Sequence, residues 1–146
     1  MDKNIRIYTD GACRGNPGPG GWGAILIYES HRKEIYGGSL LTTNNIMELM
    51  AVIEALKIIK FSSKIIVTTD SKYVKDGITK WIYNWKQKNW KTTNKKPVKN
   101  KELWIELDNI VNKHTIQWEW VKGHSGHEEN ERADYLANEG INDLYK

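Results

Sequence analysis

The sequence predicts an α/β fold in which a mixed five-stranded sheet is flanked by helices. Two observations support this class. β-Branched runs typical of strands alternate with segments whose apolar residues recur at helical spacing, and a strand–helix–strand succession implies a right-handed crossover between parallel strands. The 146 residues suffice to bury a core without disulfides or a structural metal. We therefore expect a single domain over residues 1–146.

The first three expected strands come before any helix. A β-branched run over residues 5–10 predicts the first strand. Residues 15–21 are rich in Gly and Pro, which favours a loop. Residues 22–28 and 34–40 predict the second and third strands, and the polar residues 29–33 between them suit a hairpin connection.

Helices and strands alternate in the remainder of the chain. Asn44 and Asn45 are good N-caps for a helix whose apolar residues, from Ile46 to Ile59, recur at helical spacing. The elements expected after it are, in order, a strand over residues 65–70, a short helix over 72–79, an amphipathic helix over 101–113, a strand over 115–121 and a helix over 128–139.

Two of the β-branched runs each end in an aspartate followed by a small residue. Asp10 precedes Gly11, and Asp70 precedes Ser71. Open α/β sheets keep their sites in the crevice beyond the carboxyl ends of the strands, and the crossover would set these aspartates on neighbouring strand ends. Adjacent carboxylates repel each other unless a divalent cation neutralises them, and their oxygens suit Mg²⁺ or Mn²⁺. A lone aspartate of this kind more often begins a turn or a cap, but two matched runs favour a site.

Two further carboxylates are candidates for the same site. Glu48 is expected in the first turn of the long helix, with Ala51, Val52 and Ala55 on its flank, so that it points into an apolar sector. A carboxylate there is costly unless something binds it. Asp134 lies on the last helix, and taken alone it would be an ordinary solvated residue.

One segment concentrates the positive charge of the chain. Residues 80–101 contain eight lysines and no acidic residue, so the rest of the chain is net acidic although the formal charge is +4. The segment also holds Trp81, Trp85 and Trp90, and Trp81 and Trp85 share a helical face. Lysines interleaved with flat rings suit a phosphate backbone and its sugars. The alternative is a solvated basic helix whose tryptophans dock it on the body of the protein.

A glycine-flanked histidine stands between the last strand and the last helix. Imidazole moves protons near neutral pH, and a loop containing His124 between Gly123 and Gly126 would let it do so. A surface histidine in a turn is an equally good interpretation of these residues alone. A zinc site made of His124, His127 and Cys13 is weaker, because the set lacks a compact ligand spacing.

Composition bounds the cellular setting. The single cysteine, Cys13, cannot form an internal disulfide. No apolar run approaches the roughly 20 residues that span a bilayer, and no basic start precedes an apolar stretch. We expect a soluble, cytoplasmic protein.

Several segments together resemble one family, ribonuclease H of type 1, whose bacterial-type members are ribonucleases HI. They occur in the family's order and cover nearly the whole chain. The segments are Tyr8-Thr9-Asp10-Gly11, Gly15-Asn16-Pro17-Gly18, Thr43-Asn44-Asn45-Ile46-Met47-Glu48, Thr69-Asp70-Ser71, residues 81–100, Val121-Lys122-Gly123-His124-Ser125-Gly126 and Asn130-Glu131-Arg132-Ala133-Asp134.

The resemblance implies a ribonuclease H-like fold and an endonuclease that hydrolyses the RNA strand of RNA–DNA hybrids. Asp10, Glu48, Asp70 and Asp134 match the family's four metal-binding carboxylates. It implies two Mg²⁺ ions, with Mn²⁺ possible in their place, roughly 4 Å apart, for in-line displacement that leaves 3′-hydroxyl and 5′-phosphate ends. His124 matches a loop histidine that assists proton transfer or product release.

The resemblance also assigns substrate contacts. Those expected to bind the RNA strand, through its 2′-hydroxyls, are Cys13, Gly15, Asn16, Asn44 and Asn45. Those expected to bind the DNA strand are Trp81 and Trp85 in a sugar channel, and Thr43 and Asn100 in a phosphate pocket. Leu41 stands where some relatives place an arginine near that pocket, which predicts a weaker phosphate grip.

The lysine-rich segment resembles the protruding basic helix and loop of cellular bacterial enzymes, which implies a self-sufficient enzyme. We expect it to be a monomer. The lysines expected to contact the substrate are Lys86, Lys88, Lys91, Lys95, Lys96 and Lys99. Two other classes share the fold: nucleic-acid-binding modules that have lost the carboxylates, and transposases and resolvases that act on DNA alone. The four carboxylates disfavour the first class, and the positions expected to bind 2′-hydroxyls disfavour the second.

Overall fold

A computed structural model describes residues 4–122 and 127–146 of the chain. The strands are β1 (Ile5–Cys13), β2 (Gly18–Tyr28), β3 (His31–Thr42), β4 (Lys64–Thr69) and β5 (Thr115–Trp120). The helices are α1 (Asn44–Ile58), α2 (Lys72–Asp76), the π-helical turn η1 (Gly77–Trp81), α3 (Ile82–Gln87), α4 (Lys101–Val111) and α5 (Glu128–Asp143).

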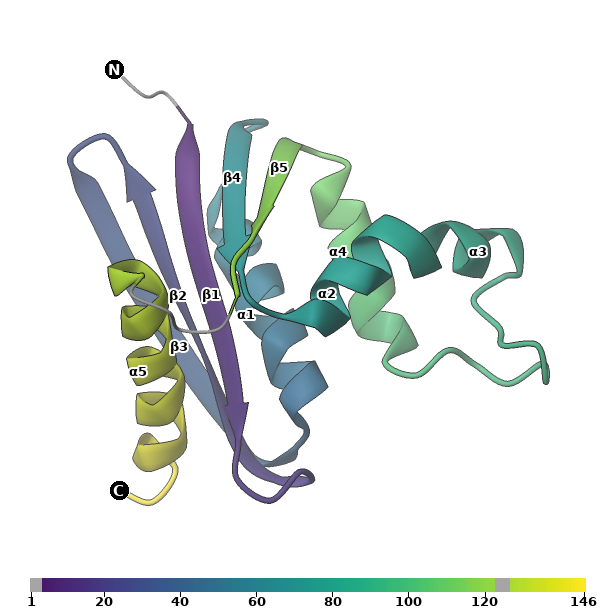
Figure 1. Cartoon of the computed structure of the whole chain (residues 1–146), viewed down its shortest axis with the longest axis horizontal. Helices are drawn as coiled ribbons and strands as arrows, with labels where there is room; N and C mark the ends of the chain where they lie inside the picture. Colours follow the sequence, from purple (N-terminus) through teal and green to yellow (C-terminus); the bar gives the residue numbers. More distant parts are fainter. Residues whose placement is uncertain (1–3, 123–126) are drawn as a thin grey trace.

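The sheet has five strands in the order β3-β2-β1-β4-β5. β1, β2 and β3 pair antiparallel, whereas β4 pairs parallel with both β1 and β5. The connection from β1 to β4 contains α1, and the connection from β4 to β5 contains α2, η1, α3 and α4 (Figure 1). The predicted mixed five-stranded sheet with flanking helices is confirmed.

Helices cover both faces of this sheet. α5 lies across β1, β2 and β3 on one face, and α1 packs on the other face with α4 beside it (Figure 1). The larger core cluster lies between the sheet and α1 and α4, with Ile7, Leu49 and Trp104 fully buried. A smaller cluster, Ile25, Ala133 and Leu136, lies under α5. Both faces of the sheet are therefore covered by helices that pack on buried apolar residues.

The Gly/Pro-rich stretch is only partly a loop. β2 begins at Gly18, so the prediction of a loop over residues 15–21 was wrong for its second half. The physical reason is the close packing of α5: a Cβ added to Gly21 would lie 2.0 Å from the Ala137 carbonyl oxygen. Glycine here permits helix-to-sheet contact inside a strand, and the same residue type usually signals a turn.

Other boundaries also differ from the predictions. β3 runs over twelve residues, longer than the predicted 34–40, and the hairpin turn shrinks to Glu29 and Ser30. The N-cap of α1 is Thr43, whose hydroxyl accepts from the Ile46 N–H at 3.2 Å, so Asn44 and Asn45 are the first helical residues. The predicted short helix over 72–79 continues through η1 and α3 to Gln87.

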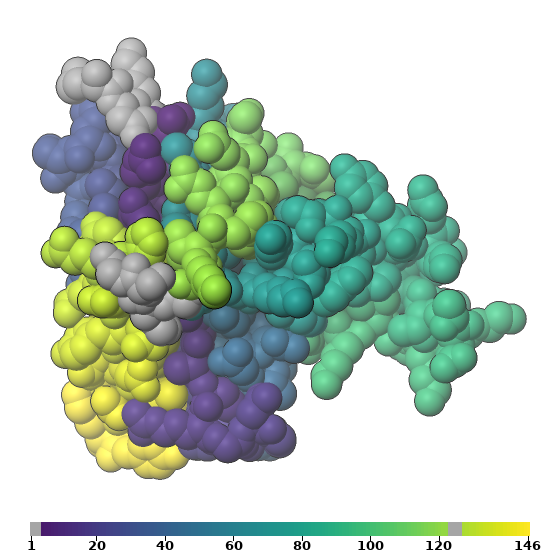
Figure 2. Space-filling model, viewed as in Figure 1, coloured from purple at the N-terminus to yellow at the C-terminus, as the bar shows by residue number. Residues whose placement is uncertain are grey.

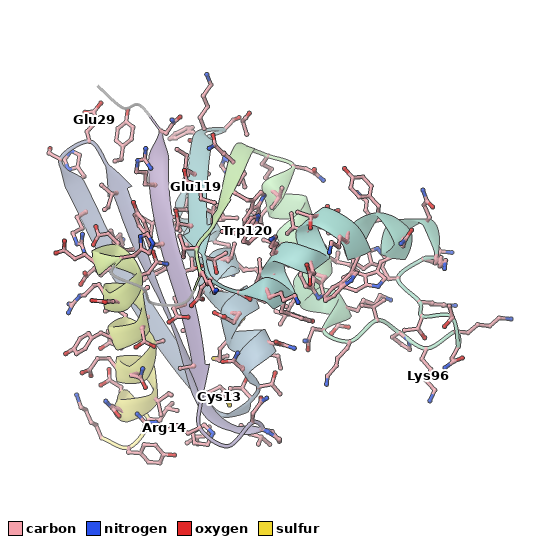
Figure 3. The ribbon with its side chains drawn as sticks, viewed as in Figure 1. Cys13, Arg14, Glu29, Lys96, Glu119 and Trp120 are labelled. Atoms are coloured by element: carbon pink, nitrogen blue, oxygen red, sulfur yellow. The ribbon has the colours of Figure 1, made fainter. Side chains whose placement is uncertain are left out.

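The helical segment α2-η1-α3 and the loop after it extend away from the sheet (Figures 1 and 2). Figure 3 shows Lys96 at the far end of this projection. Among the described residues, no helix has both the length and the apolar character that crossing a membrane requires.

Candidate active site

Asp10 and Asp70 stand where β1 and β4 part. The parallel pairing of these strands ends at Tyr8 and Thr68, and each aspartate lies two residues beyond that last pair. Because the register is the same on both strands, the two carboxylates come side by side. The prediction that Asp10 ends its strand was wrong, because β1 continues against β2 as far as Cys13. The separation of β4 from β1, and not the end of β1, opens the crevice.

Glu48 reaches the same place from α1. It lies in the second turn of that helix, one turn later than predicted, and is 8% exposed. β1 passes so close to α1 that a Cβ on Gly11 would lie 2.6 Å from the Glu48 backbone nitrogen. The Gly11 N–H donates a hydrogen bond to the Asp10 Oδ1 at 2.9 Å, and the Gly11 backbone and the Ser71 side chain both favour the charged form of Glu48. Carboxylate oxygens of Asp10, Glu48 and Asp70 lie within 4.8 Å of one another.

Asp134 approaches from the opposite face of the sheet, on α5. Its carboxylate lies close enough to that of Asp10 to raise the pKa of Asp10, and its own backbone and side-chain oxygens accept from the Asn138 amide at 3.0 and 3.5 Å. All four predicted carboxylates line one pocket of about 420 Å³. The structure thus brings together side chains from four elements on both sides of the sheet.

Negative charge is unfavourable in the carboxylate cluster, and the pKa values of two of its members are raised. Burial raises the pKa of Asp10 from 3.8 to about 8, and the charges of Asp70 and Asp134 add to the effect. Burial also raises the pKa of Glu48 well above its usual 4.5, with further repulsion from Asp10 and Asp70, although the hydrogen bonds from Gly11 and Ser71 oppose the rise. Carboxylates this close repel one another, and a divalent cation bound among them would relieve that repulsion.

The donor set fits a hard divalent cation. Every candidate ligand atom in the cluster is a carboxylate oxygen, which is the donor that Mg²⁺ and Mn²⁺ prefer over nitrogen or sulfur. The backbone around Gly11 is too close to α1 to admit a bulkier residue that would fill the site. The zinc alternative requires His124, which lies outside the described residues, so the structure does not test it.

Part of the set of residues expected to bind an RNA strand lies beside the carboxylates. Asn44 and Asn45 line the same pocket as the four acids. The Asn44 N–H donates to the Asn16 side-chain oxygen at 2.9 Å, which joins the loop after β1 to the start of α1. The Cys13 thiol lies 3.5 Å from the Thr42 carbonyl oxygen and 3.6 Å from that of Gly18. Gly15 has a φ of +75°, which only glycine adopts at little cost.

The residues expected to bind a DNA strand lie farther out. The rings of Trp81 and Trp85 have centroids 5.7 Å apart, and Trp85 also packs 5.4 Å from Trp104 and 6.1 Å from Trp90. Both rings are half-buried, so part of each faces solvent. Thr43 caps α1 and Asn100 precedes α4, and these two helices pack together. Leu41 is 75% exposed at the end of β3.

The lysines of the projection are largely solvent-exposed. Lys88, Lys91, Lys95, Lys96 and Lys99 make no ion pair within residues 4–122 and 127–146, whereas Lys86 pairs with Asp108 of α4 at 3.1 Å. Trp90 and Trp85 pack against the core, as the docking alternative for the tryptophans predicted. The exposed, unpaired lysines are what a phosphate-binding surface requires.

Sequence reasoning missed several supporting residues. Ser71 caps α2 through the Val74 N–H and also donates to Glu48. The Tyr73 hydroxyl accepts from the Asn100 amide at 3.1 Å and from the Trp104 indole at 3.0 Å, which fixes the predicted DNA-strand residue. Ser71 could have been found, since it follows a candidate ligand and precedes a helix. The Tyr73 contacts join residues about 30 positions apart, and no local pattern signals them.

One ion-pair network holds the start of α5 against the sheet. Arg132 donates two hydrogen bonds of 2.9 Å to Glu34 of β3, and Arg32 bridges Glu34 and Glu129. Arg132 is two residues before Asp134, so this network orients the turn that carries the fourth carboxylate.

Comparison with known proteins identifies the family. The ribonuclease H family model matches residues 2–142. A ribonuclease H of Alcanivorax borkumensis is 62% identical over 97% of this chain and 94% of its own length, and a ribonuclease HI of Neisseria meningitidis is 58% identical over 96% and 97%.

Solved structures agree with these relatives. The crystal structure of LC9-RNase H1, a type 1 RNase H with the type 2 active-site motif, superposes with a TM-score of 0.87 at 35% identity, covering 98% of this chain and 74% of that one. The structure of LC11-RNase H1 in complex with an RNA/DNA hybrid superposes at 0.72 with 27% identity, covering 98% and 100%. With its carboxylate cluster, its sheet and these relatives, the chain belongs to the ribonuclease H family, enzymes that cleave the RNA of RNA–DNA hybrids.

Proposed function

We propose that this protein is a monomeric endoribonuclease that hydrolyses the RNA strand of RNA–DNA hybrids with two Mg²⁺ ions held by Asp10, Glu48, Asp70 and Asp134. The observation that carries the proposal is the buried carboxylate cluster, three of whose members have oxygens within 4.8 Å of one another. One chain supplies the whole set, so a single copy suffices for the chemistry.

The metal ions would supply a hydroxide nucleophile at neutral pH and would offset the charge that develops on the leaving 3′ oxygen. Asp10 and Glu48 would hold those ions with side chains that burial leaves little freedom to move. Asp70 and Asp134 are half-buried, at the open side of the cluster where a scissile phosphate can approach. The products would be a 3′-hydroxyl and a 5′-phosphate.

The remaining residues of the chain would orient the substrate. Asn44 and Asn45, at the edge of the carboxylate pocket, present amide groups that can hydrogen bond 2′-hydroxyls of the RNA strand. Asn16, which bonds to Asn44, would extend these contacts, together with Cys13 and Gly15. Trp81 and Trp85 offer rings on which a sugar without a 2′-hydroxyl packs, and Thr43 and Asn100 would hold a phosphate of the DNA strand. His124 would assist proton transfer or product release from the loop after β5.

The test is cleavage of three labelled duplexes, an RNA–DNA hybrid, duplex DNA and duplex RNA, each with Mg²⁺ or with EDTA. We expect cutting of the RNA strand of the hybrid, only with Mg²⁺, to 3′-hydroxyl and 5′-phosphate ends. Asp134→Asn should abolish turnover and leave hybrid binding largely intact, because it removes one anionic ligand from a folded site.

A matched control comes from the same helix. Asp143, at the far end of α5, accepts from the Tyr36 hydroxyl at 2.6 Å and pairs with Lys146 at 2.9 Å, far along the helix from the cluster. Asp143→Asn should keep full activity. Comparable cutting in EDTA, or by Asp134→Asn, would refute the two-metal assignment, and duplex DNA cut as fast as the hybrid would favour a DNA-acting nuclease instead.

A further inference from the structure

A second pocket adjoins the carboxylate site on the side of α2. It has a volume of about 410 Å³, which is within the range of ligand sites. Asp70, Ser71 and Lys72 line both this pocket and the carboxylate pocket. A phosphate held at the carboxylates therefore has this second pocket as its immediate neighbour. We call it the lysine pocket, and its lining residues used below are Lys72, Lys75, Lys80, Trp120 and Lys122.

The lysine pocket carries an excess of positive charge. Four lysines from α2, η1 and the segment after β5 face two aspartates, Asp70 and Asp76. Asp76 is paired with Lys80 at 3.7 Å, and Asp70 belongs to the carboxylate cluster. Lys72 and Lys75 are exposed and make no ion pair within the parts of the chain that the structure describes. The charge is that of an anion site.

The floor of the lysine pocket is rigid and aromatic. Trp120 stacks on Trp118 with ring centroids 5.6 Å apart and planes 5° apart, and both pack against the main core. Figure 3 shows Trp120 at the end of β5 next to the start of α2, and Figure 2 shows the two segments adjoining on one face of the molecule. A ring beside lysines suits a sugar–phosphate backbone better than a small inorganic anion, because the ring offers a surface for the sugar or base.

The helical segment α2-η1 separates this pocket from the tryptophans expected to bind DNA. Tyr73 and Trp81 lie on one face of that segment, with ring centroids 5.7 Å apart. Lys72, Asp76 and Lys80, at intervals of four residues, lie on another face. A strand on the tryptophan face would lie on the other side of this segment, whereas a strand whose phosphate lies at the carboxylates would have the lysine pocket beside it, because Asp70, Ser71 and Lys72 line both pockets.

We propose that the lysine pocket binds a backbone phosphate of the RNA-containing strand, next to the phosphate that is cleaved, with the adjoining sugar on Trp120. This assignment depends on the proposed function, since it requires that strand at the carboxylates. Lys75 and Lys80 line the lysine pocket and not the carboxylate pocket. Their contribution is therefore to binding and strand position, separate from the metal site.

The test uses Lys75→Gln/Lys80→Gln and, as a control with the same charge change, Lys60→Gln/Lys64→Gln. Lys64 begins β4 and Lys60 lies four residues before it; both are exposed, at the opposite end of that strand from Asp70. The substrates are hybrids whose cleaved strand has a short run of ribonucleotides between deoxynucleotide flanks, which fixes the cut. In each substrate one flank phosphate is replaced by an uncharged methylphosphonate.

For the wild type and the control, we expect one flank position at which the uncharged phosphate raises KM by about three- to tenfold, the effect of one lost charge-assisted contact. In Lys75→Gln/Lys80→Gln that penalty should vanish, KM for the unmodified hybrid should rise by a similar factor, and kcat should change less than about twofold. The slope of log KM against log salt should fall by roughly 0.9 for each lost contact. Lys75→Arg/Lys80→Arg should restore the penalty.

Three results would overturn the assignment: no sensitive flank position in the wild type, a penalty that persists in Lys75→Gln/Lys80→Gln, or an equal loss in the control. A fourth result would also overturn the assignment: inorganic phosphate inhibits the wild type and the control but not Lys75→Gln/Lys80→Gln, while the methylphosphonate penalty on KM is unchanged. The pocket would then bind a free anion. Failure of the wild type to cut the unmodified hybrid would instead refute the proposed function. Thermal unfolding of each variant verifies that it is folded.

Discussion

Replacing Asp10 with asparagine should stabilise the metal-free protein while destroying its activity. Asp10 is 4% exposed and lies among Glu48, Asp70 and Asp134, so its charge is unfavourable unless a cation is bound. The asparagine side chain has nearly the same shape but carries no charge. Folding of the variant no longer requires that a carboxylate be buried beside three others.

The size of the effect follows from the pKa of Asp10, which the fold raises from 3.8 to about 8. At about 1.4 kcal/mol per pKa unit, this shift corresponds to an upper limit of about 6 kcal/mol of lost stability above pH 8. A buried amide also costs energy to desolvate, so we expect a net gain of about 2–4 kcal/mol in Asp10→Asn. For a chain of this length that gain corresponds to a rise of about 5–15 °C in Tm.

The pH dependence has a definite sign. Because the folded protein holds the Asp10 proton more tightly than the unfolded chain does, the stabilising contribution is complete below pH 4 and is lost as the pH rises through about 8. The wild type should therefore lose stability relative to Asp10→Asn between pH 5 and pH 9. Glu48, whose pKa is also raised, adds to the loss in the wild type.

The assay is thermal unfolding followed by circular dichroism at pH 5 and pH 9 in EDTA. Glu54→Gln is the control, because Glu54 forms an exposed pair with Lys57 at 3.5 Å and its loss should change stability by less than about 1 kcal/mol. Adding Mg²⁺ should raise the Tm of the wild type more than that of Asp10→Asn, since binding stabilises the folded state by mass action. An Asp10→Asn protein no more stable than the wild type at pH 9, or a difference independent of pH, would refute this reasoning.

Three further predictions concern other parts of the molecule. His124→Ala should slow cleavage by roughly 10²-fold or less and retain full metal dependence. A loss of activity in steady-state assays as complete as that of Asp134→Asn would mean that the histidine has a larger role. Replacing Lys95, Lys96 and Lys99 with Gln should raise KM and lower the slope of log KM against log salt by roughly 0.9 for each lost phosphate contact. An unchanged slope would show that these lysines are solvated and do not contact the substrate. The pKa of Glu34 is lowered to about 2, chiefly by the hydrogen bond from Arg132 and further by Arg32. The stability that Glu34 contributes is therefore present above its usual pKa of 4.5 and lost as the pH falls toward 2. Glu34→Gln should lower the Tm at pH 6 by a few degrees, and the difference from the wild type should shrink in acid; a constant difference in melting curves from pH 2 to 6 would contradict this.

The sequence by itself determined which elements form and which chemical groups are available. Alternation of β-branched residues, helical spacing and the crossover rule were enough for five strands in a mixed sheet, because these signals come from residues near one another in the chain. The aspartates after two matched runs pointed to a cation site for the same local reason. The lysine-rich segment was visible in composition alone.

Only the tertiary structure decided where those groups meet. Gly21 belongs to a strand because α5 packs against it, and Asp10 faces a crevice because β4 leaves β1 after Thr68, neither of which a local pattern records. Glu48 and Asp134 reach one site from opposite faces of the sheet. The lysine pocket joins α2 to residues some 50 positions later. Such contacts depend on how distant segments pack, and packing is set by the whole chain at once.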